Sequence, residues 1–347
     1  MITFNEWEKS IVGVTERYLS WRKKRRLAKK EKQKKRNPIL DWMDAILSAV
    51  VIVLVINQYF LQAYQIPSAS MEPTLLITDR IFVNKLVYGP ELAPGIVKLP
   101  GFGNPTRGDI IIFESPEYLP RRSPIIGPVL MDVIQRVVYM VTLSLVDIDR
   151  DENGQPKHHF LIKRAIGIGG DRIRMRDGEV EILTPGETEW KQEAVLKKEL
   201  GFTYPDVRMY TPEDYADFRA AGVGVAYKKA GLPTTAAQDA AISKYYMVSK
   251  DAQGNLKVDA KVADDGIEYE LWSVRTMSQM DPSNQADLVD WQIYRNGWYI
   301  NRNSIFPMGD NRDNSRDARY FGQVKLSKVL GKASFRYWPL SRFGLVR

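Results

Sequence analysis

Two serines, Ser68 and Ser70, lie one residue apart in the segment I-P-S-A-S-M-E-P-T-L (66–75), where prolines at 67 and 73 stiffen the chain. A serine hydroxyl becomes an effective nucleophile only when a base within hydrogen-bond reach removes its proton. Histidine is the usual base, but the only two histidines, His158 and His159, are adjacent in a polar stretch that favours a solvated loop. A lysine whose pKa is lowered by burial can serve instead. The chemistry therefore depends on which lysine lies beside the serines.

Lys163 is the lysine whose surroundings stand out. In F-L-I-K-R-A-I-G-I (160–168), strand alternation places Lys163 on one face with Leu161 and Ala165, and places Arg164 on the opposite face. A lysine between apolar residues of a strand is more often an edge residue whose ammonium reaches solvent. The segment alone is therefore weak evidence for catalysis.

A third stretch, M-G-D-N-R-D-N-S-R-D-A-R-Y-F-G (308–322), concentrates Asp, Asn and Arg between two apolar segments. It can be read as a charged, solvated turn. It can equally form a fixed polar network that orients a lysine amine and holds a serine hydroxyl beside it.

The sequence contains little evidence for catalysis by cysteine or by a metal ion. The chain has no cysteine, which excludes disulfides, thiol catalysis and cysteine-based metal sites. No His-x-x-x-His spacing or carboxylate-flanked histidine pair indicates a zinc site. We therefore expect neither a metal nor an organic cofactor.

Four segments, in order, resemble the conserved boxes of the bacterial type I signal peptidases. They are I-P-S-A-S-M-E-P-T-L, R-G-D-I-I-I-F, K-R-A-I-G-I-G-G-D and G-D-N-R-D-N-S-R-D-A-R, and they extend over most of residues 45–338. One box alone would be weak, but four in the right order behind an apolar segment are specific. The third box departs from the family's usual Gly-Leu-Pro-Gly-Asp ending, and Ala69 stands where glycine is frequent.

The resemblance implies a role for each reactive residue. Ser70 would be the nucleophile and Lys163 the general base. Ser68 would donate its hydroxyl to the oxyanion, together with the backbone N–H of Ser70. Ser315 matches the serine that orients the lysine.

The same resemblance implies supporting residues. Asp310 would pair with Arg164, and Asp317 with Arg319. Shallow apolar pockets would accept small side chains of the substrate, and their candidate wall residues are Tyr64, Ile66, Met71, Leu75 and Ile162.

The charge pattern indicates how the chain lies relative to a membrane. The net charge of +8 would suggest nucleic acid as a partner, but residues 22–36 alone carry +10, so the remainder carries −2. The stretch from Ala45 to Met71 contains no charged residue and is long enough to cross a bilayer. The basic run before it predicts a cytoplasmic N-terminus.

The remaining elements predict a mostly β fold: an antiparallel-sheet catalytic core with an inserted mixed cap, behind one N-terminal transmembrane helix. Strands are expected at 80–87, 108–113, 159–168, 171–175, 177–183 and 331–338, with helices near 212–221 and 234–246. The predicted divisions are 1–41 (cytoplasmic, with the basic cluster), 42–64 (anchor), 65–183 (core, with an insertion at 114–158), 184–300 (cap) and 301–347 (core).

These observations predict a single-pass serine endopeptidase of the bacterial inner (cytoplasmic) membrane that removes signal peptides from exported preproteins. Its partners would be preprotein signal peptides, the lipid bilayer and, transiently, the secretion machinery, with no nucleic acid. A self-cleaving Ser/Lys repressor-type protease and an inactive, anchored β domain that binds exported chains are the alternatives. A second apolar segment, 128–146, is interrupted by Asp132, Gln135 and Arg136 and is expected not to span the membrane.

Overall fold

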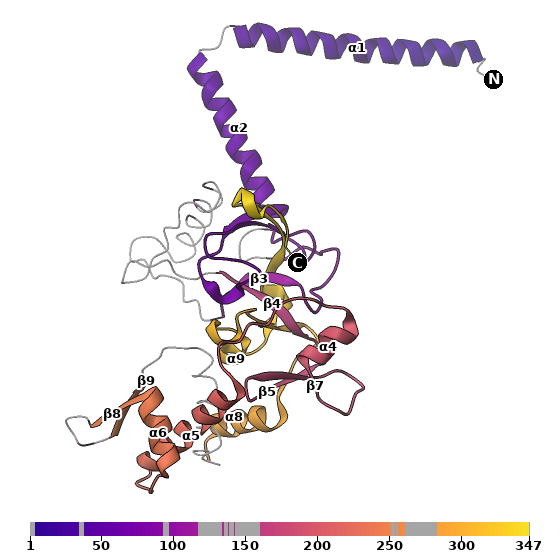
Figure 1. Cartoon of the computed structure of the whole chain (residues 1–347). Coiled ribbons are helices and arrows are strands. Elements are labelled where there is room, and N and C mark those ends of the chain that lie inside the picture. Colours follow the sequence, from indigo (N-terminus) through magenta and orange to yellow (C-terminus); the bar gives the residue numbers. More distant parts are fainter. Residues whose placement is uncertain are drawn as a thin grey trace. The chain divides into compact units, whose positions relative to one another are not determined.

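The computed structural model of the chain describes residues 4–34, 38–92, 97–116, 160–250, 256–260 and 283–346, with single residues at 134, 138, 142 and 254 (Figure 1). The chain divides into two compact units, Met1–Val53 and Leu54–Arg347. His158, His159 and nearly all of 128–146 lie outside the described residues, so the predictions made for them remain predictions.

The N-terminal unit is helical. It contains α1 (Phe4–Lys34) and most of α2 (Pro38–Tyr59). Asp41–Tyr59 is long and apolar enough to cross a membrane, and no other helix in the described ranges passes that test. The helix ends at Tyr59 and β1 begins at Leu61, so residues 61–64, which the prediction included in the anchor, form part of a strand. The difference arises because residues 61–65 pair with a neighbouring strand instead of continuing the helix.

The core of the second unit is an eight-stranded antiparallel sheet with the order β1-β2-β13-β3-β4-β11-β12, and β14 pairs with β13. The strands are β1 (Leu61–Gln65), β2 (Arg80–Asn84), β3 (Ile110–Glu114), β4 (Phe160–Ile168), β11 (Ser304–Met308), β12 (Val324–Lys325), β13 (Val329–Trp338) and β14 (Gly344–Leu345). In this sheet β13 lies between β2 and β3, and β11 lies beside β4. Segments from the first and last parts of the unit are therefore neighbours.

The centre of this sheet is apolar on both faces. β3 has the continuous sequence I-I-I-F, and Ile111, Ile112 and Phe113 are fully buried. Each such side chain stabilises the fold by roughly 1.5–3 kcal/mol. The register pairs Ile111 with Lys163 of β4, so the lysine lies on the central part of the sheet and not at an edge.

A second, four-stranded sheet has the order β10-β5-β6-β7. It consists of β5 (Arg172–Arg176), β6 (Glu179–Leu183), β7 (Lys191–Gln192) and β10 (Trp298–Tyr299). The boundary predicted at residue 184 therefore falls inside a sheet, because β7 and β10 pair with strands assigned to the core. The predicted boundary between core and cap follows the change in sequence polarity near residue 184. Pairing between strands does not depend on that polarity.

The remainder of the cap is mixed, as predicted. α5 (Pro212–Lys229) packs on α6 (Ala236–Tyr245), and the hairpin of β8 (Tyr246–Lys250) and β9 (Leu256–Ala260) contacts both helices (Figure 1). Thr211 and Thr235 form capping boxes that fix where the two helices begin. The described part of the cap also contains α4 (Glu193–Leu200) and α8 (Gln285–Asn296).

Short helical turns connect these elements: η1 (Ala69–Met71), η2 (Arg312–Asn314), α9 (Ala318–Phe321), η3 (Leu326–Lys328) and η4 (Leu340–Arg342). The prediction of a mostly β fold with an antiparallel core, a mixed cap and one apolar N-terminal helix is confirmed. Since β3 ends at Glu114 and its neighbour β4 begins at Phe160, the predicted insertion lies in a connection between two adjacent antiparallel strands.

Candidate active site

Ser70 lies in the short turn η1, which follows β1. It is almost completely buried, whereas Ser68, two residues earlier, has an extended backbone and is exposed. Two hydrogen bonds from Asn311 fix the turn: its backbone N–H donates to the carbonyl of Ser70 at 3.1 Å, and its side-chain Nδ2 donates to the carbonyl of Ala69 at 3.3 Å. The loop after β11 therefore holds the turn that carries both serines.

Lys163 reaches Ser70 from β4. Its Nζ lies 2.5 Å from Ser70 Oγ, and only 3 % of the residue is exposed. The Oγ atoms of Ser68 and Ser70 are 3.4 Å apart. The structure thus brings together three residues that the sequence separates by up to 95 positions, in the arrangement that transfer of a proton from the hydroxyl to the amine requires.

Ser315 lies close to the turn that carries Ser70. Its hydroxyl donates to Asp317 Oδ2 at 2.7 Å, so the remaining lone pairs of Ser315 Oγ are acceptors. A side chain at Gly309 would collide with Ser315 Oγ and with the carbonyl of Ser70. The absence of a side chain at 309 is therefore what allows Ser315 to approach the turn that carries Ser70 closely.

Asp317 also pairs with Arg319. Arg319 Nε donates to Asp317 Oδ1 at 2.9 Å, and the backbone N–H of Gly309 donates to Oδ2 at 3.0 Å. Burial alone would raise the pKa of Asp317, but the Arg319 charge and these hydrogen bonds outweigh it and hold the pKa below its ordinary value. The Asp317–Arg319 contact predicted from the resemblance is present.

The second predicted pair, Asp310 with Arg164, is also present. Arg164 Nε and Nη2 donate to the two carboxylate oxygens at 2.7 and 2.6 Å, and both side chains are buried. Arg164 Nη1 donates to the carbonyl of Gly108, and the guanidinium lies over the ring of Tyr204. Thr74 donates to the same carboxylate at 2.6 Å. This bidentate pair joins β4 to the segment after η1 and to the loop that follows β11.

Two residues of the 308–322 stretch make contacts that were not expected from the sequence. Arg312 is fully buried, and its Nη2 donates to Glu193 of α4 at 2.8 Å. Asp313 accepts the backbone N–H of Met209 at 2.6 Å and the hydroxyl of Tyr215 in α5 at 2.7 Å. The stretch that supports the serines therefore also attaches the cap. Arg312 and Asp313 belong to the predicted polar network, but the spacing of residues in the sequence does not indicate that their partners lie in the cap.

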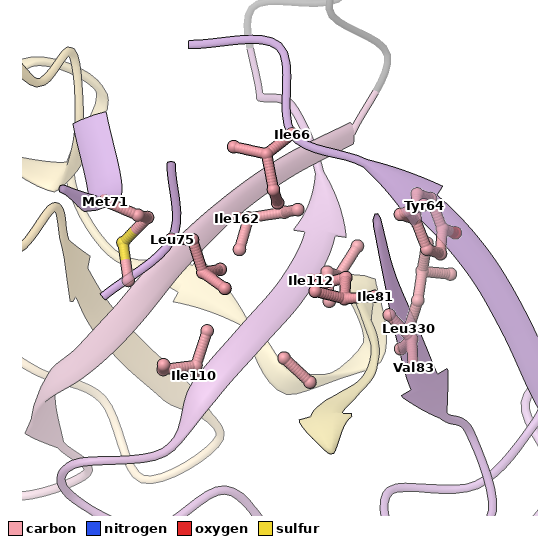
Figure 2. Close-up of a cluster of buried hydrophobic side chains, with 11 residues drawn as sticks. Tyr64, Ile66, Met71, Leu75, Ile81, Val83, Ile110, Ile112, Ile162 and Leu330 are labelled. Carbon is pink, nitrogen blue, oxygen red and sulfur yellow. The ribbon is translucent and has the colours of Figure 1, made fainter. Parts of the chain in front are cut away.

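A cleft of about 250 Å³ opens beside the serines. Its lining residues are Ile66, Pro67, Ser68, Ser70, Met71, Ser115, Phe160, Leu161, Ile162, Lys163, Asn314 and Arg316. Three of the five predicted pocket residues, Ile66, Met71 and Ile162, are among them. Tyr64 and Leu75 are not. All five residues belong to one buried apolar cluster, which Figure 2 shows. The apolar residue type alone does not indicate which members of such a cluster also line a cleft.

A buried ion pair supports the third box. Arg107 Nη2 donates to Asp171 Oδ2 at 2.8 Å, and the backbone N–H of Ile168 donates to the same oxygen at 2.7 Å. Burial raises the pKa of Asp171, and the Arg107 charge opposes that rise. The turn therefore keeps its aspartate contact although the proline usual in the related boxes is missing. Among the described residues, no group of three His, Asp or Glu is placed to share a metal ion.

Comparison with known proteins adds independent information. The family model described as "Signal peptidase, peptidase S26" matches residues 39–219 and 226–338. Signal peptidase I of Aquifex aeolicus is 28 % identical over 292 residues, which cover 83 % of this chain and 80 % of that protein. Signal peptidase I of Buchnera aphidicola (subspecies Acyrthosiphon pisum) is 24 % identical over 313 residues, 87 % of this chain and 76 % of the relative. Signal peptidase I of Haemophilus influenzae is 23 % identical over 310 residues, 87 % and 70 % of the two chains.

Proposed function

Because the chain belongs to the peptidase S26 family and is a signal peptidase I enzyme, we propose that it cleaves signal peptides with Ser70 as the nucleophile and Lys163 as the general base. The observation that carries this proposal is the 2.5 Å contact between Lys163 Nζ and Ser70 Oγ in a cleft of about 250 Å³.

In the acylation step, Ser70 Oγ attacks the scissile carbonyl carbon while its proton passes to Lys163 Nζ. The developing oxyanion is stabilised by the hydroxyl of Ser68 and the backbone N–H of Ser70. When the tetrahedral intermediate collapses, the C–N bond breaks and Lys163 returns the proton to the leaving amine. The signal peptide remains attached to Ser70 as an ester.

In the deacylation step, Lys163 removes a proton from a water molecule, which attacks the ester carbonyl. The C–O bond to Ser70 breaks, and the proton returns to the serine oxygen. This mechanism requires Lys163 to be neutral in the resting enzyme. Its burial favours that state, because a low-dielectric environment disfavours the ammonium form.

The substrate is a preprotein whose cleavage segment lies extended in the cleft. Ile66, Met71 and Ile162 would contact the small side chains next to the scissile bond. The apolar helix 41–59 anchors the enzyme in the inner membrane, and the basic run before it keeps the N-terminus cytoplasmic. The catalytic unit then lies on the exported side, where it meets signal peptides in the bilayer and, transiently, the secretion machinery.

The test is cleavage of a preprotein by the purified full chain in detergent. We expect Ser70→Ala to abolish turnover with unchanged thermal unfolding, and Ser334→Ala, which removes a serine of β13 outside the cleft, to leave turnover unchanged. Processing by a Ser70→Ala protein free of contaminating peptidase would overturn the nucleophile assignment.

The identity of the base is tested separately. A double His158→Ala, His159→Ala variant should cleave the preprotein at the wild-type rate, because Lys163 supplies the base. A well-folded double variant without activity would contradict the Ser/Lys mechanism.

A further inference from the structure

Asn311 contacts both peptide units that flank the nucleophile. Its side-chain Nδ2 donates to the carbonyl of Ala69 at 3.3 Å, which belongs to the peptide unit that precedes Ser70. Its backbone N–H donates to the carbonyl of Ser70 at 3.1 Å, which belongs to the peptide unit that follows. The first of these units also contains the N–H of Ser70, the group that would donate to the oxyanion. The contact of the Asn311 side chain with Ala69 therefore bears on the oxyanion site.

The backbone of Asn311 is held independently of its side chain. The residue is 7 % exposed and forms a parallel bridge with Val207. The N–H of Val207 donates to the carbonyl of Asp310 at 2.8 Å, and the N–H of Arg312 donates to the carbonyl of Val207 at 2.8 Å. A change of the side chain at 311 should therefore leave the backbone hydrogen bond to Ser70 in place.

The carboxamide of Asn311 can bind Ala69 in one orientation only. Nδ2 carries the donors of this side chain, whereas Oδ1 is an acceptor. The opposite orientation would bring Oδ1 against the carbonyl of Ala69, where two acceptors repel one another. Oδ1 is buried and accepts no hydrogen bond from the described residues, so the side chain is held through its nitrogen.

The carbonyl of Ala69 and the N–H of Ser70 are opposite sides of one planar unit. In a trans peptide the two groups point in opposite directions. Ser68 and Ser70 line the cleft, whereas neither Ala69 nor Asn311 is among its described lining residues. Because the carbonyl points towards Asn311, the N–H of Ser70 is directed away from the loop after β11, to the side on which the serines line the cleft.

We propose that Asn311 is a positioning residue for the oxyanion site. By binding the carbonyl of Ala69, it holds the N–H of Ser70 in the direction from which that group donates to the negative oxygen. The hydrogen bond also polarises the peptide unit, which makes its N–H a stronger donor. The inference deepens the proposed function and rests on it, because Ser70 must be the nucleophile.

The first test is preprotein cleavage by the full chain in detergent. Asn311→Ala and Asn311→Leu both remove the donor, and the second keeps the approximate size of the side chain. We expect kcat to fall by about 10–100-fold, less than or equal to the loss of a whole oxyanion donor, with KM nearly unchanged, because the donor acts on the transition state. Since one neutral hydrogen bond is lost, the melting temperature should fall by no more than about 5 °C.

The control for a loss of stability is Thr235→Ala. Thr235 caps α6 in the cap, so its loss destabilises the fold without touching the turn that carries Ser70. This variant should keep the wild-type kcat. A fall in kcat for the two Asn311 variants alone therefore reports on the site and not on general stability.

A second measurement separates positioning of the N–H from a loosening of the whole site. The probes are a fluorescent peptide that ends in an alanine aldehyde and the corresponding peptide alcohol. Ser70 Oγ forms a bond to the aldehyde carbon, the electron pair of the C=O bond moves to the oxygen, and the hydroxyl proton passes to Lys163 Nζ. The resulting oxyanion occupies the site to which the N–H of Ser70 donates. The alcohol makes the same side-chain contacts but cannot form this bond.

Fluorescence anisotropy with the full chain in detergent gives the affinity ratio of aldehyde to alcohol for each enzyme. We expect both Asn311 variants to lower this ratio by about tenfold or more and to bind the alcohol as the wild type does, because only the tetrahedral adduct uses the oxyanion donor. Thr235→Ala should keep the wild-type ratio.

A wild-type ratio in both Asn311 variants, or an equal loss of affinity for the two peptides, would overturn the inference. Failure of the proposed function has a different signature in the same assay. With Ser70 as the nucleophile, Ser70→Ala brings the ratio close to 1, whereas a wild-type ratio in Ser70→Ala would show that another group attacks the aldehyde.

Discussion

The ion pair of Arg164 with Asp310 allows a quantitative prediction. In Asp310→Asn the size of the side chain is kept, but the carboxylate that accepts two hydrogen bonds from Arg164 and one from Thr74 is lost. Arg164 is 1 % exposed, so its charge has no access to water in compensation. An uncompensated buried charge of this kind costs about 3–5 kcal/mol.

That loss is large relative to the total free energy of unfolding. Folded domains are typically stable by about 5–15 kcal/mol, and 1 kcal/mol corresponds to roughly 2–3 °C for a domain of this size. We therefore expect the melting temperature of Asp310→Asn to fall by about 6–15 °C. Activity should fall as well, because the pair fixes the strand that carries Lys163.

Thermal unfolding of the full chain in detergent, followed by tryptophan fluorescence, measures this effect. The control is Glu199→Gln, which weakens a solvent-exposed pair with Lys191 and should cost no more than about 1 kcal/mol. Replacing both charges, in Arg164→Met with Asp310→Leu, should give a protein more stable than Asp310→Asn. Equal melting temperatures for Asp310→Asn and Glu199→Gln would refute the reasoning.

Three further predictions follow from the site and one from the topology. Lys163→Arg should be inactive in the preprotein assay at every pH, because the guanidinium stays protonated; measurable turnover would exclude a general-base role. Ser68→Ala should lower kcat by about 10²–10³-fold, as loss of one oxyanion donor does, and an unchanged kcat would exclude that role. Since the pKa of Asp317 is lowered in the fold, its stabilising contribution is complete above its unfolded value of about 3.9 and is lost as pH falls through the folded value. The melting-temperature difference between wild type and Asp317→Asn should therefore shrink from pH 7 to about pH 3, and a constant difference would contradict this linkage. Single cysteines at Pro120 and Gln155 should both react with an impermeant thiol reagent from the exported side, and labelling at 120 alone would make 128–146 a membrane span.

The β core was predictable because its strands are marked by local patterns. The run I-I-I-F at 110–113 and the run at 160–168 are apolar and bounded by Gly or charged residues, and each forms a strand close to its expected limits. The helices expected near 212–221 and 234–246 begin close to their expected starts, where a threonine cap precedes each helix, but α5 continues to Lys229. Local chemistry determines these elements.

Pairing between distant segments was not predictable in the same way. The dyad and its two supporting ion pairs were expected only through the resemblance to a family, since no spacing rule relates residue 70 to residue 163. Without such a guide, the contacts of Arg312 with Glu193 and of Asp313 with Tyr215 could not be inferred, because each depends on the register between the cap and the loop. The strand at 61–65 was missed for a similar reason: these residues are uncharged and follow the apolar helix directly, and only their pairing with β2 makes them a strand.

The charge pairs around the site bear on how a lysine can act as the base. An uncompensated carboxylate near Lys163 would stabilise the ammonium form and raise the pKa of the amine, which would suppress its action as a base. In the structure, Asp310 is neutralised by Arg164 and Asp317 by Arg319, and both pairs are buried. The arginines thereby let carboxylates organise the loop without adding net negative charge to it. We therefore expect the loss of Arg319, which leaves the buried carboxylate of Asp317 uncompensated, to raise the pH at which activity appears.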